Sequence, residues 1–229
     1  MTRLRVFRCI LTTQDFLYFA SYDVKSISFT EKIIHNFALS YAIHYCNSVI
    51  DRTKKPQYEQ DMKSMTKFPT PAMIIDDPTL VEHTYNALDD SSQKTKKTKY
   101  EKTFSPSYGT YYKIPPNTKF SFYLVCIDNE PPRRIIRLGK KDCLCTIDFY
   151  ELNKVVQKET DIRSILISHP INPVELQAEI ESYERILFIP PSPITLNTRI
   201  IGKYLQATDN KGTIHKIAIT KRFQSAFIN

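Results

Sequence analysis

The sequence predicts an α+β fold in which strands outnumber helices. Runs of β-branched and aromatic residues recur along the chain, whereas only two segments carry helical spacing. No internal repeat is present. A sheet with helices on one face, as in the ferredoxin-like or RNA-recognition (RRM-like) arrangement, accounts for this mixture. With 229 residues, the chain is long enough to bury such a core and to carry a long excursion from it.

The first predicted element is a strand near the N-terminus. The segment "RLRVFRCILTT" is rich in β-branched and aromatic residues, and its alternation places Leu4 and Val6 on one face. We expect this strand to begin the sheet.

A helix is predicted next. Between Ile33 and Val49 the apolar residues recur with the 3.6-residue period of an amphipathic helix. Ser28 and Glu31 have the spacing of a capping box, and Thr30 is a competing N-cap, so the helix is expected to begin there. The stretch "FASYDVKSISFTEKIIHNFALSYAIHY" is therefore predicted to be a strand end, a loop and a docking helix.

Residues 51–118 differ in composition from the rest of the chain. They are polar, interrupted by prolines and short of aliphatic residues, so they cannot bury much apolar surface alone. We predict a core formed by residues 1–50 and 119–229, with an inserted extension over residues 51–118. Lysines precede tyrosines in this extension, a mixture that suits single-stranded nucleic acid or an acidic partner. The candidate residues are Lys96, Lys97, Lys99 and Tyr111, and the alternative is a merely solvated lysine run.

A basic turn follows the next predicted strand, residues 119–127. Strand-like apolar residues flank a glycine that is surrounded by cations in "RRIIRLGKKDCLCTIDFYEL". A glycine lets the backbone turn tightly or approach a phosphate closely, and the flanking cations can neutralise phosphates. The alternative is a charged β-turn without a ligand. The candidate residues are Arg133, Arg134, Arg137, Gly139, Lys140 and Lys141.

The C-terminal third predicts strands around one more helix. The segment "SILISHPINPVELQAEIESYERILFIPPSP" indicates a strand, a proline-marked turn, a short helix from about Pro173 to Tyr183, and another strand. The last part, "TRIIGKYLQATDNKGTIHKIAITKRF", indicates a β-hairpin joined by the turn from Asp209 to Gly212.

Composition favours a nucleic-acid partner. The chain carries a formal net charge of +8, and it contains 14 Tyr and 13 Phe but no Trp. Phosphates attract cations and unpaired bases stack on aromatic rings, so this combination is typical of RNA- and DNA-binding proteins. A basic surface over an aromatic core is the alternative.

The sequence indicates a cytoplasmic protein without a metal or cofactor. Arginines interrupt the apolar residues at the N-terminus, and no apolar run approaches membrane-spanning length. The five cysteines lack the spacing of metal ligands, which favours buried free thiols in a reducing compartment. Four glycines in the chain and the absence of a Walker-type loop argue against a nucleotide-binding fold.

Three blocks of the sequence resemble a known family. They are "LYFASYDVKSISFTEKIIHNFALSYAI", "IIRLGKKDCLCTI" and "SHPINP", and the first contains a TE-x-x-x-x-N-[FY]-AL-x-YA pattern from Thr30 to Ala42. In order and spacing they resemble the Csc family, the small RAMP-type subunit of the type I-D CRISPR Cascade complex. The resemblance runs from Val6 to about Lys221 and is weak over residues 51–118. Asp142 and the cysteines after it depart from the family pattern.

This resemblance implies a ferredoxin-like RAMP core with a protruding β-rich extension. It further implies a subunit that caps the 5′ handle of the CRISPR RNA and contacts the backbone subunit and the large subunit. In that family the subunit lies near the end where target DNA enters, beside its adjacent motif. The resemblance therefore predicts a non-catalytic RNA-binding subunit for antiviral defence.

Two other functions remain open from the sequence. Some RAMP proteins cleave RNA with a histidine, tyrosine or lysine, so a metal-independent endoribonuclease that processes repeat RNA is the first alternative. No histidine lies in a suggestive motif with Tyr or Lys, and no catalytic residue is assigned. A protein-binding adaptor is the other alternative. The histidines are His35, His44, His83, His169 and His215.

Overall fold

The structure is a computed structural model that describes residues 4–25, 27–44, 56–61, 64–86 and 108–228. Strands dominate this part of the chain, and three helices accompany them. The predicted α+β class, rich in strands, is therefore confirmed. The helices are α1 (Asn36–His44), α2 (Tyr58–Asp61) and α3 (Lys221–Ile228).

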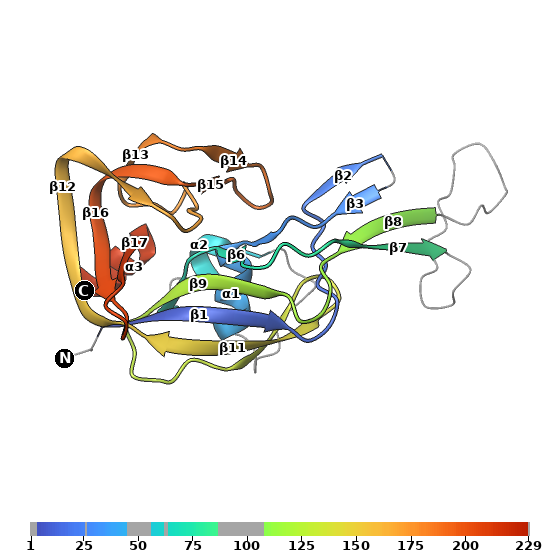
Figure 1. Cartoon of the computed structure of the whole chain (residues 1–229), viewed down its shortest axis with the longest axis horizontal. Coiled ribbons are helices and arrows are strands. Elements are labelled where there is room, and N and C mark those ends of the chain that lie inside the picture. Colours follow the sequence, from blue (N-terminus) through green and yellow to red (C-terminus); the bar gives the residue numbers. More distant parts are fainter. Residues whose placement is uncertain (1–3, 26, 45–55, 62–63, 87–107, 229) are drawn as a thin grey trace.

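A seven-stranded main sheet forms the centre of the molecule (Figure 1). The N-terminal strand β1 lies between β9 and β11 and is antiparallel to both. The strand order is β10-β11-β1-β9-β6-β4, and β5 also pairs with β9. The strands are β1 (Arg5–Thr13), β4 (Ile33–Ile34), β5 (Lys67–Pro69), β6 (Ala72–Ile74), β9 (Lys119–Cys126), β10 (Ile135–Leu138) and β11 (Cys143–Glu151).

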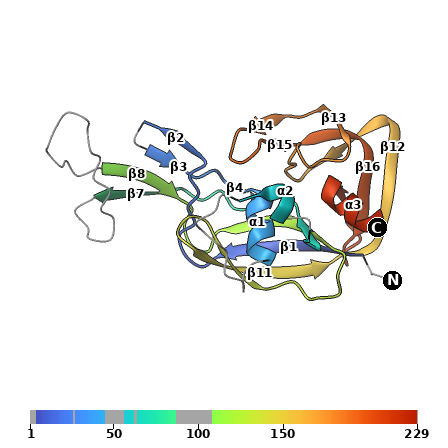
Figure 2. The same ribbon diagram turned by 180° about the vertical axis from the view of Figure 1, so that it is seen from behind.

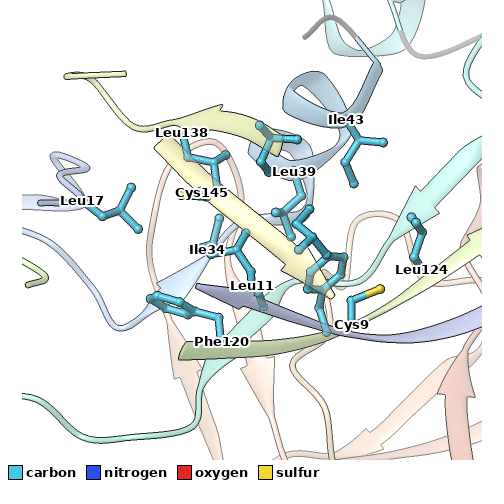
Figure 3. Close-up of a cluster of buried hydrophobic side chains, with 14 of the residues drawn as sticks. Cys9, Leu11, Leu17, Ile34, Leu39, Ile43, Phe120, Leu124, Leu138 and Cys145 are labelled. Carbon is cyan, nitrogen blue, oxygen red and sulfur yellow. The ribbon is translucent and has the colours of Figure 1, made fainter. Parts of the chain in front are cut away.

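Helix α1 covers one face of the main sheet, as the view from behind shows (Figure 2). Alternate residues of β1, among them Cys9 and Leu11, point into the same core as Leu39 and Ile43 of the helix (Figure 3). This packing follows from the period of two in a strand and the apolar stripe of the helix. The predicted docking role of the helix is confirmed.

A second sheet, the C-terminal sheet, covers one end of the opposite face of the main sheet. Its order is β12-β16-β13, and β17 pairs with the other edge of β16. Val6, Phe68 and Val125 of the main sheet share a core with Leu205 and Ile217 of this sheet. The strands are β12 (Asn153–Ile167), β13 (Glu179–Ser182), β16 (Thr198–Thr208) and β17 (Ile214–Ala218), and β14 (Arg185–Leu187) with β15 (Ile194–Leu196) forms a separate pair.

The C-terminal hairpin agrees with the prediction. Strands β16 and β17 pair antiparallel. The amide of Gly212 donates to the carbonyl of Asp209 over 3.0 Å, and the glycine has a φ of +83°. The predicted turn from Asp209 to Gly212 is confirmed.

A third sheet protrudes from the main sheet (Figure 1, right). Its order is β2-β3-β8-β7, with β3 and β8 parallel. Tyr22–Val24 and Ile27–Phe29, in the segment that the sequence indicated as a loop, are thus two antiparallel strands of this extension. Residues 67–74, from the range predicted as an insertion, instead pair with β9 in the main sheet. The strands are β2 (Tyr22–Val24), β3 (Ile27–Phe29), β7 (Val81–Asn86) and β8 (Tyr108–Lys113).

Helix α1 begins later than the sequence predicted. Ile33 and Ile34 form β4 and pair with Met73 and Ala72, so they are not helical. The Thr30 hydroxyl does not cap the helix; it bonds the backbone of Phe19, accepting from the amide over 3.1 Å. The expected start near residues 28–31 was therefore wrong, because pairing with a strand distant in sequence overrode the local capping signal.

The predicted helix from Pro173 to Tyr183 is also wrong. Residues 172–176 form hydrogen-bonded turns, in which Glu175 N donates to Asn172 O over 3.2 Å. Residues Glu179–Ser182 are strand β13, whose Ile180 pairs with Ile200 of β16. An available strand edge again decided the local conformation.

A buried chain of polar side chains joins the two larger sheets. Asn172 donates from Nδ2 to Oδ1 of Asn36 over 3.1 Å, and the Ser192 hydroxyl donates to Oδ1 of Asn172 over 3.0 Å. Ser192 also lies 3.0 Å from Nε2 of His35. These four side chains are at most 9% exposed. Because buried polar groups are costly unless they are paired, this network fixes the start of α1 against the segment 172–192.

The carboxylate of Glu175 extends this network toward the C-terminal helix. It accepts a hydrogen bond from the Asn36 amide and is ion-paired with Arg222 of α3. Glu175 is 7% exposed, so its charge depends on these partners.

Candidate nucleic-acid interface

The predicted basic turn is the end of an edge hairpin. β10 is the outermost strand of the main sheet on this side, and it turns into β11 through residues 139–142. All five predicted cations have exposed side chains, and none is ion-paired with another described residue. They are Arg133, Arg134, Arg137, Lys140 and Lys141. The last three lie at the turn, whereas Arg133 and Arg134 precede β10 at its other end, where the carbonyl of Arg134 accepts from the amide of Ile147 over 2.7 Å.

Alternation along β10 explains where these cations point. Ile136 and Leu138 are buried in the core beneath α1, whereas Ile135 and Arg137 lie on the opposite, exposed face. Arg137 also donates from Nη1 to the backbone carbonyl of Asp142 over 3.1 Å, which holds its guanidinium beside the turn. The strand thus displays positive charge while its other face anchors the hairpin.

Gly139 is required by the shape of this turn. Its φ is +77°, a conformation that L residues rarely adopt. A Cβ at this position would lie 2.6 Å from the carbonyl oxygen of Tyr18. The same oxygen accepts a hydrogen bond of 2.9 Å from the amide of Lys140. Of the two roles expected for the glycine, the tight turn is therefore present.

Tyr111 lies near the turn because Tyr18 bridges the two. The rings of Tyr18 and Tyr111 are 4.8 Å apart, while the Tyr18 backbone contacts Gly139. Tyr111 is only 8% exposed, so little of its ring is available for stacking. Lys113, next on the same face of β8, places its ammonium 4.8 Å from the Tyr111 ring and 5.4 Å from that of Phe16.

Sequence reasoning missed Lys113 and Phe16 as part of this surface. The signal was present only as alternation in "YYK", since Tyr111 and Lys113 share a face once the segment is a strand. Lys96, Lys97 and Lys99, the other predicted cations, lie outside the described residues.

Three histidines have both ring nitrogens engaged by groups of the protein. His169 accepts from the amide of Ala218 at Nε2 over 3.1 Å, and its Nδ1 lies 2.8 Å from the carbonyl of Pro170. His35 accepts from the amide of Phe37 at Nδ1 over 3.1 Å, and its Nε2 faces Ser192. Burial lowers the pKa of both to about 4. Burial also lowers the pKa of His44, whose two nitrogens contact backbone groups.

His215 has side-chain partners that its sequence context did not reveal. Its Nδ1 lies 2.9 Å from the Tyr123 hydroxyl, and its Nε2 lies 3.3 Å from Oδ2 of Asp209. Backbone amides of the turn, that of Thr213 first, lower the pKa of Asp209, and burial raises the pKa of Tyr123. Both ring nitrogens are committed and the side chain is 10% exposed, so the trio joins the C-terminal hairpin to β9.

Metal ligands are not gathered within the described ranges. No group of three or more His, Cys, Asp or Glu side chains is arranged to hold a metal there. Cys9, Cys126, Cys143 and Cys145 are buried free thiols, as predicted, and the fifth cysteine, Cys46, lies outside the described residues. Neither does any helix in the described part of the chain have the length and apolar character to cross a membrane.

Comparison with known proteins identifies the family. A family model described as Type I-D CRISPR-associated protein Cas5/Csc1 matches residues 4–224. No curated protein sequence matches the chain. Among solved structures, the chain is similar to a chain of the type III-B Cmr-beta complex, determined by cryo-EM with cognate target RNA and AMPPnP. That similarity has a TM-score of 0.41 and 11% identity, and it covers 96% of this chain and 88% of that chain. The family match spans nearly the whole sequence, and the protein therefore belongs to the type I-D CRISPR-associated Cas5/Csc1 family.

Proposed function

We propose that this protein is a non-catalytic subunit of a type I-D Cascade complex in the cytoplasm and binds the 5′ handle of the CRISPR RNA. In this role it helps to position the large and backbone subunits for recognition of target DNA near its adjacent motif. Membership of the Cas5/Csc1 family supports the assignment to a CRISPR effector. The observation that carries the RNA-binding part is the edge hairpin β10–β11, which displays the exposed cations Arg137, Lys140 and Lys141 at a turn fixed by Gly139, with Arg133 and Arg134 at the other end of β10.

Charge favours RNA independently of the family. Five like charges within nine residues repel one another unless they are fanned apart or face an anion, and RNA supplies closely spaced phosphates. Lys113 adds a sixth cation beside the turn. Phosphate contacts fix the register of a nucleic acid, whereas base contacts specify its sequence.

A ferredoxin-like core is part of the proposal. In chain order the elements are β1, α1, β5 with β6, β9 and β11, and in space β11, β1, β9 and β6 lie side by side. This order agrees with a ferredoxin-like sheet in which β1 is central. Strand β10 takes the place of the second helix, because residues 127–142 between β9 and β11 contain no helix.

We assign the protruding sheet to contact with the backbone subunit. On one of its faces Tyr22, Phe29 and Tyr112 stack in a row, with ring centroids 5.1 and 4.9 Å apart. Tyr22 is 43% exposed and Val24, on the same face, is 51% exposed. The faces that these three rings turn toward one another are covered by their own stacking. Glu82 accepts a hydrogen bond from the Tyr112 hydroxyl over 3.0 Å. An apolar face of this kind with an acidic neighbour suits a protein partner better than RNA.

The non-catalytic assignment rests on the histidines. His35, His44 and His169 have both ring nitrogens engaged inside the protein, so none is free to move a proton on a bound RNA. Two arrangements favour an endoribonuclease as a second candidate function: Tyr123 with His215 and Asp209, and the exposed His83, whose ring lies 5.0 Å from that of Tyr111 beside Lys113.

The test is incubation of the purified chain with two labelled RNAs and no metal. We expect the chain to bind the repeat-derived 5′ handle and to leave unprocessed repeat RNA intact. Failure to bind the handle would refute the RNA-binding role. Cleavage of the repeat that is lost in His215→Ala or in His83→Ala would establish the endoribonuclease instead.

A further inference from the structure

The face of the main sheet opposite α1 is covered over only part of its area. Register defines three rows on its uncovered part: Thr146–Thr12–Lys119, Asp148–Ile10–Ser121 and Tyr150–Arg8–Tyr123, each ordered β11, β1, β9. The next row along, which contains Val6 and Val125, is buried by the C-terminal sheet. This face is turned toward the viewer in Figure 1, where β9, β1 and β11 pass in front of α1.

The uncovered part has an unusual composition for a sheet face. Tyr150 is 56% exposed, and Ile135, which pairs with Thr146, is 60% exposed. Two cations, Arg8 and Lys119, stand among the hydroxyl groups of Thr12 and other small polar residues. Neither cation has a hydrogen-bond or ion-pair partner among the described residues. Tyr150 thus presents an exposed ring in register with the unpaired cation Arg8.

Charge and polarity decide what this face suits. Arg8, Lys119 and Arg137 lie on it, whereas Asp148 is the one acid in its three rows. The apolar area is small and interspersed with hydroxyls, which a protein partner would leave incompletely paired. Single-stranded RNA satisfies the three kinds of group together, because phosphates meet cations, bases stack on rings, and the 2′-hydroxyl bonds polar side chains.

The row Tyr150–Arg8–Tyr123 is the part of this face that fits single-stranded RNA most specifically. Directly opposed residues in an antiparallel pair have Cβ atoms roughly 5 Å apart, so Arg8 is flanked by a tyrosine on each neighbouring strand. The Tyr123 hydroxyl is held by His215 at 2.9 Å, which fixes that ring as a wall at the border of the C-terminal sheet. Tyr150 has no such partner among the described residues, so its ring is free to take a base.

We propose that this sheet face is a second RNA-binding surface, continuous with the basic hairpin, on which Arg8 contacts a phosphate and Tyr150 stacks an unpaired base. This inference rests on the proposed RNA binding and adds the path of the strand beyond the turn. Arg137 belongs to both surfaces and connects them, because its side chain lies on the same face as Ile135 and beside the turn.

The chain contains no tryptophan, so one introduced indole reports on one position. The test titrates full-length Tyr150→Trp with the single-stranded 5′ handle and follows indole fluorescence, with Tyr183→Trp as the matched control. Tyr183 is 48% exposed but lies beyond β13, away from the main sheet. We expect saturable quenching in Tyr150→Trp and none in Tyr183→Trp, and a double-stranded RNA of equal length is expected to quench neither.

Affinity measurements on the same RNA complete the test. Tyr150→Ala is expected to weaken binding about five-fold or more, as loss of a stacking ring does. Arg8→Gln is expected to flatten the salt dependence by about 0.7 in log–log slope, whereas Arg185→Gln, an exposed control on β14, is expected to leave it unchanged. If the handle binds but Tyr150→Trp is not quenched and Arg8→Gln keeps the original slope, the second surface does not exist. If the unsubstituted chain binds no RNA, the proposed function fails first.

Discussion

Asn172 donates a hydrogen bond of 3.1 Å to the side-chain oxygen of Asn36, which lies 136 residues earlier in the chain. Asn36 belongs to the TE-x-x-x-x-N pattern and Asn172 to "SHPINP", two of the blocks on which the family resemblance depends. These blocks meet in the interior, where they join the main sheet to the C-terminal sheet. Their polar residues therefore have a structural role, and the candidate RNA surface lies on other residues.

Removing one partner of this pair is expected to destabilise the fold. Asn36→Ala leaves the Asn172 amide without a partner and removes one donor from the Glu175 carboxylate, and an unsatisfied buried polar group costs about 1–3 kcal/mol. Denaturant unfolding measures the loss. Asn210→Ala, at an exposed asparagine, is the control and is expected to change the free energy of unfolding by less than about 0.5 kcal/mol. Equal effects at both sites would contradict a structural role for the pair.

Stability is expected to fall with acidity because of His35 and His169. Their pKa is about 4 in the folded chain, against 6.5 for an ordinary histidine, because burial penalises the charged form. The unfolded chain binds more protons between these two values, so the free energy of unfolding decreases as pH falls from about 6.5 to 4. The loss is roughly 3 kcal/mol per histidine.

The measurement is thermal unfolding of His169→Gln at several pH values across this window. This variant is expected to be less stable at neutral pH and to show a shallower decline toward pH 4 than the unsubstituted chain. The control, His83→Gln, alters an exposed histidine of β7 and is expected to keep the original decline. An unchanged decline in His169→Gln would show that His169 does not contribute to it.

Substitutions at two glycines distinguish the cost of backbone strain from the cost of a steric contact. Gly139 and Gly212 both have positive φ, but they differ in the space around the position that a Cβ would occupy. At Gly139 the carbonyl oxygen of Tyr18 lies 2.6 Å from that position, whereas nothing lies within 4 Å of it at Gly212. Gly212→Ala is expected to cost about 1 kcal/mol from strain alone, and Gly139→Ala distinctly more. Gly139→Ala is further expected to weaken handle binding by displacing the cations of the turn. Denaturant unfolding compares the two variants, and equal losses of stability would exclude the close contact with Tyr18.

The protruding sheet is expected to bind protein. The double substitution Tyr22→Ser and Val24→Ser removes exposed apolar area from the aromatic row. It is expected to reduce co-purification with the backbone subunit while leaving affinity for handle RNA unchanged. Val156→Ser, at an exposed valine of β12, serves as the control. A loss of RNA affinity with intact subunit assembly would reassign this face to the guide.

Elements that depend on local pattern were predictable. Strands β1 and β9, the hairpin around Gly139 and the C-terminal hairpin follow from alternation and from glycine turns. Elements decided by distant pairing were not. Ile33 and Ile34 became a strand because β6 offered an edge, and residues 179–182 became β13 because β16 did.

The same distinction applies to the candidate site. The cations from Arg133 to Lys141 are adjacent in sequence, so their clustering was visible at once. Arg8 and Tyr150 are brought together only by the register of β1 with β11, and no local pattern carries that information. The pairing of His215 with Tyr123 was hidden for the same reason, because it depends on the docking of the C-terminal hairpin against β9.

The hairpin β10–β11 is proposed to bind the phosphates of the CRISPR RNA handle, and the salt dependence of binding is the sharpest test of that role. Arg137, Lys140 and Lys141 are all replaced by alanine, and the dissociation constant for single-stranded handle RNA is measured across a range of salt concentrations. If two or three phosphates are neutralised, the log–log slope is expected to flatten by about 1.4–2.1, since each contributes about 0.7. Affinity is expected to fall and the melting temperature to change little, because the three side chains are exposed. A triple variant that binds the handle with the original affinity and slope would contradict the claim.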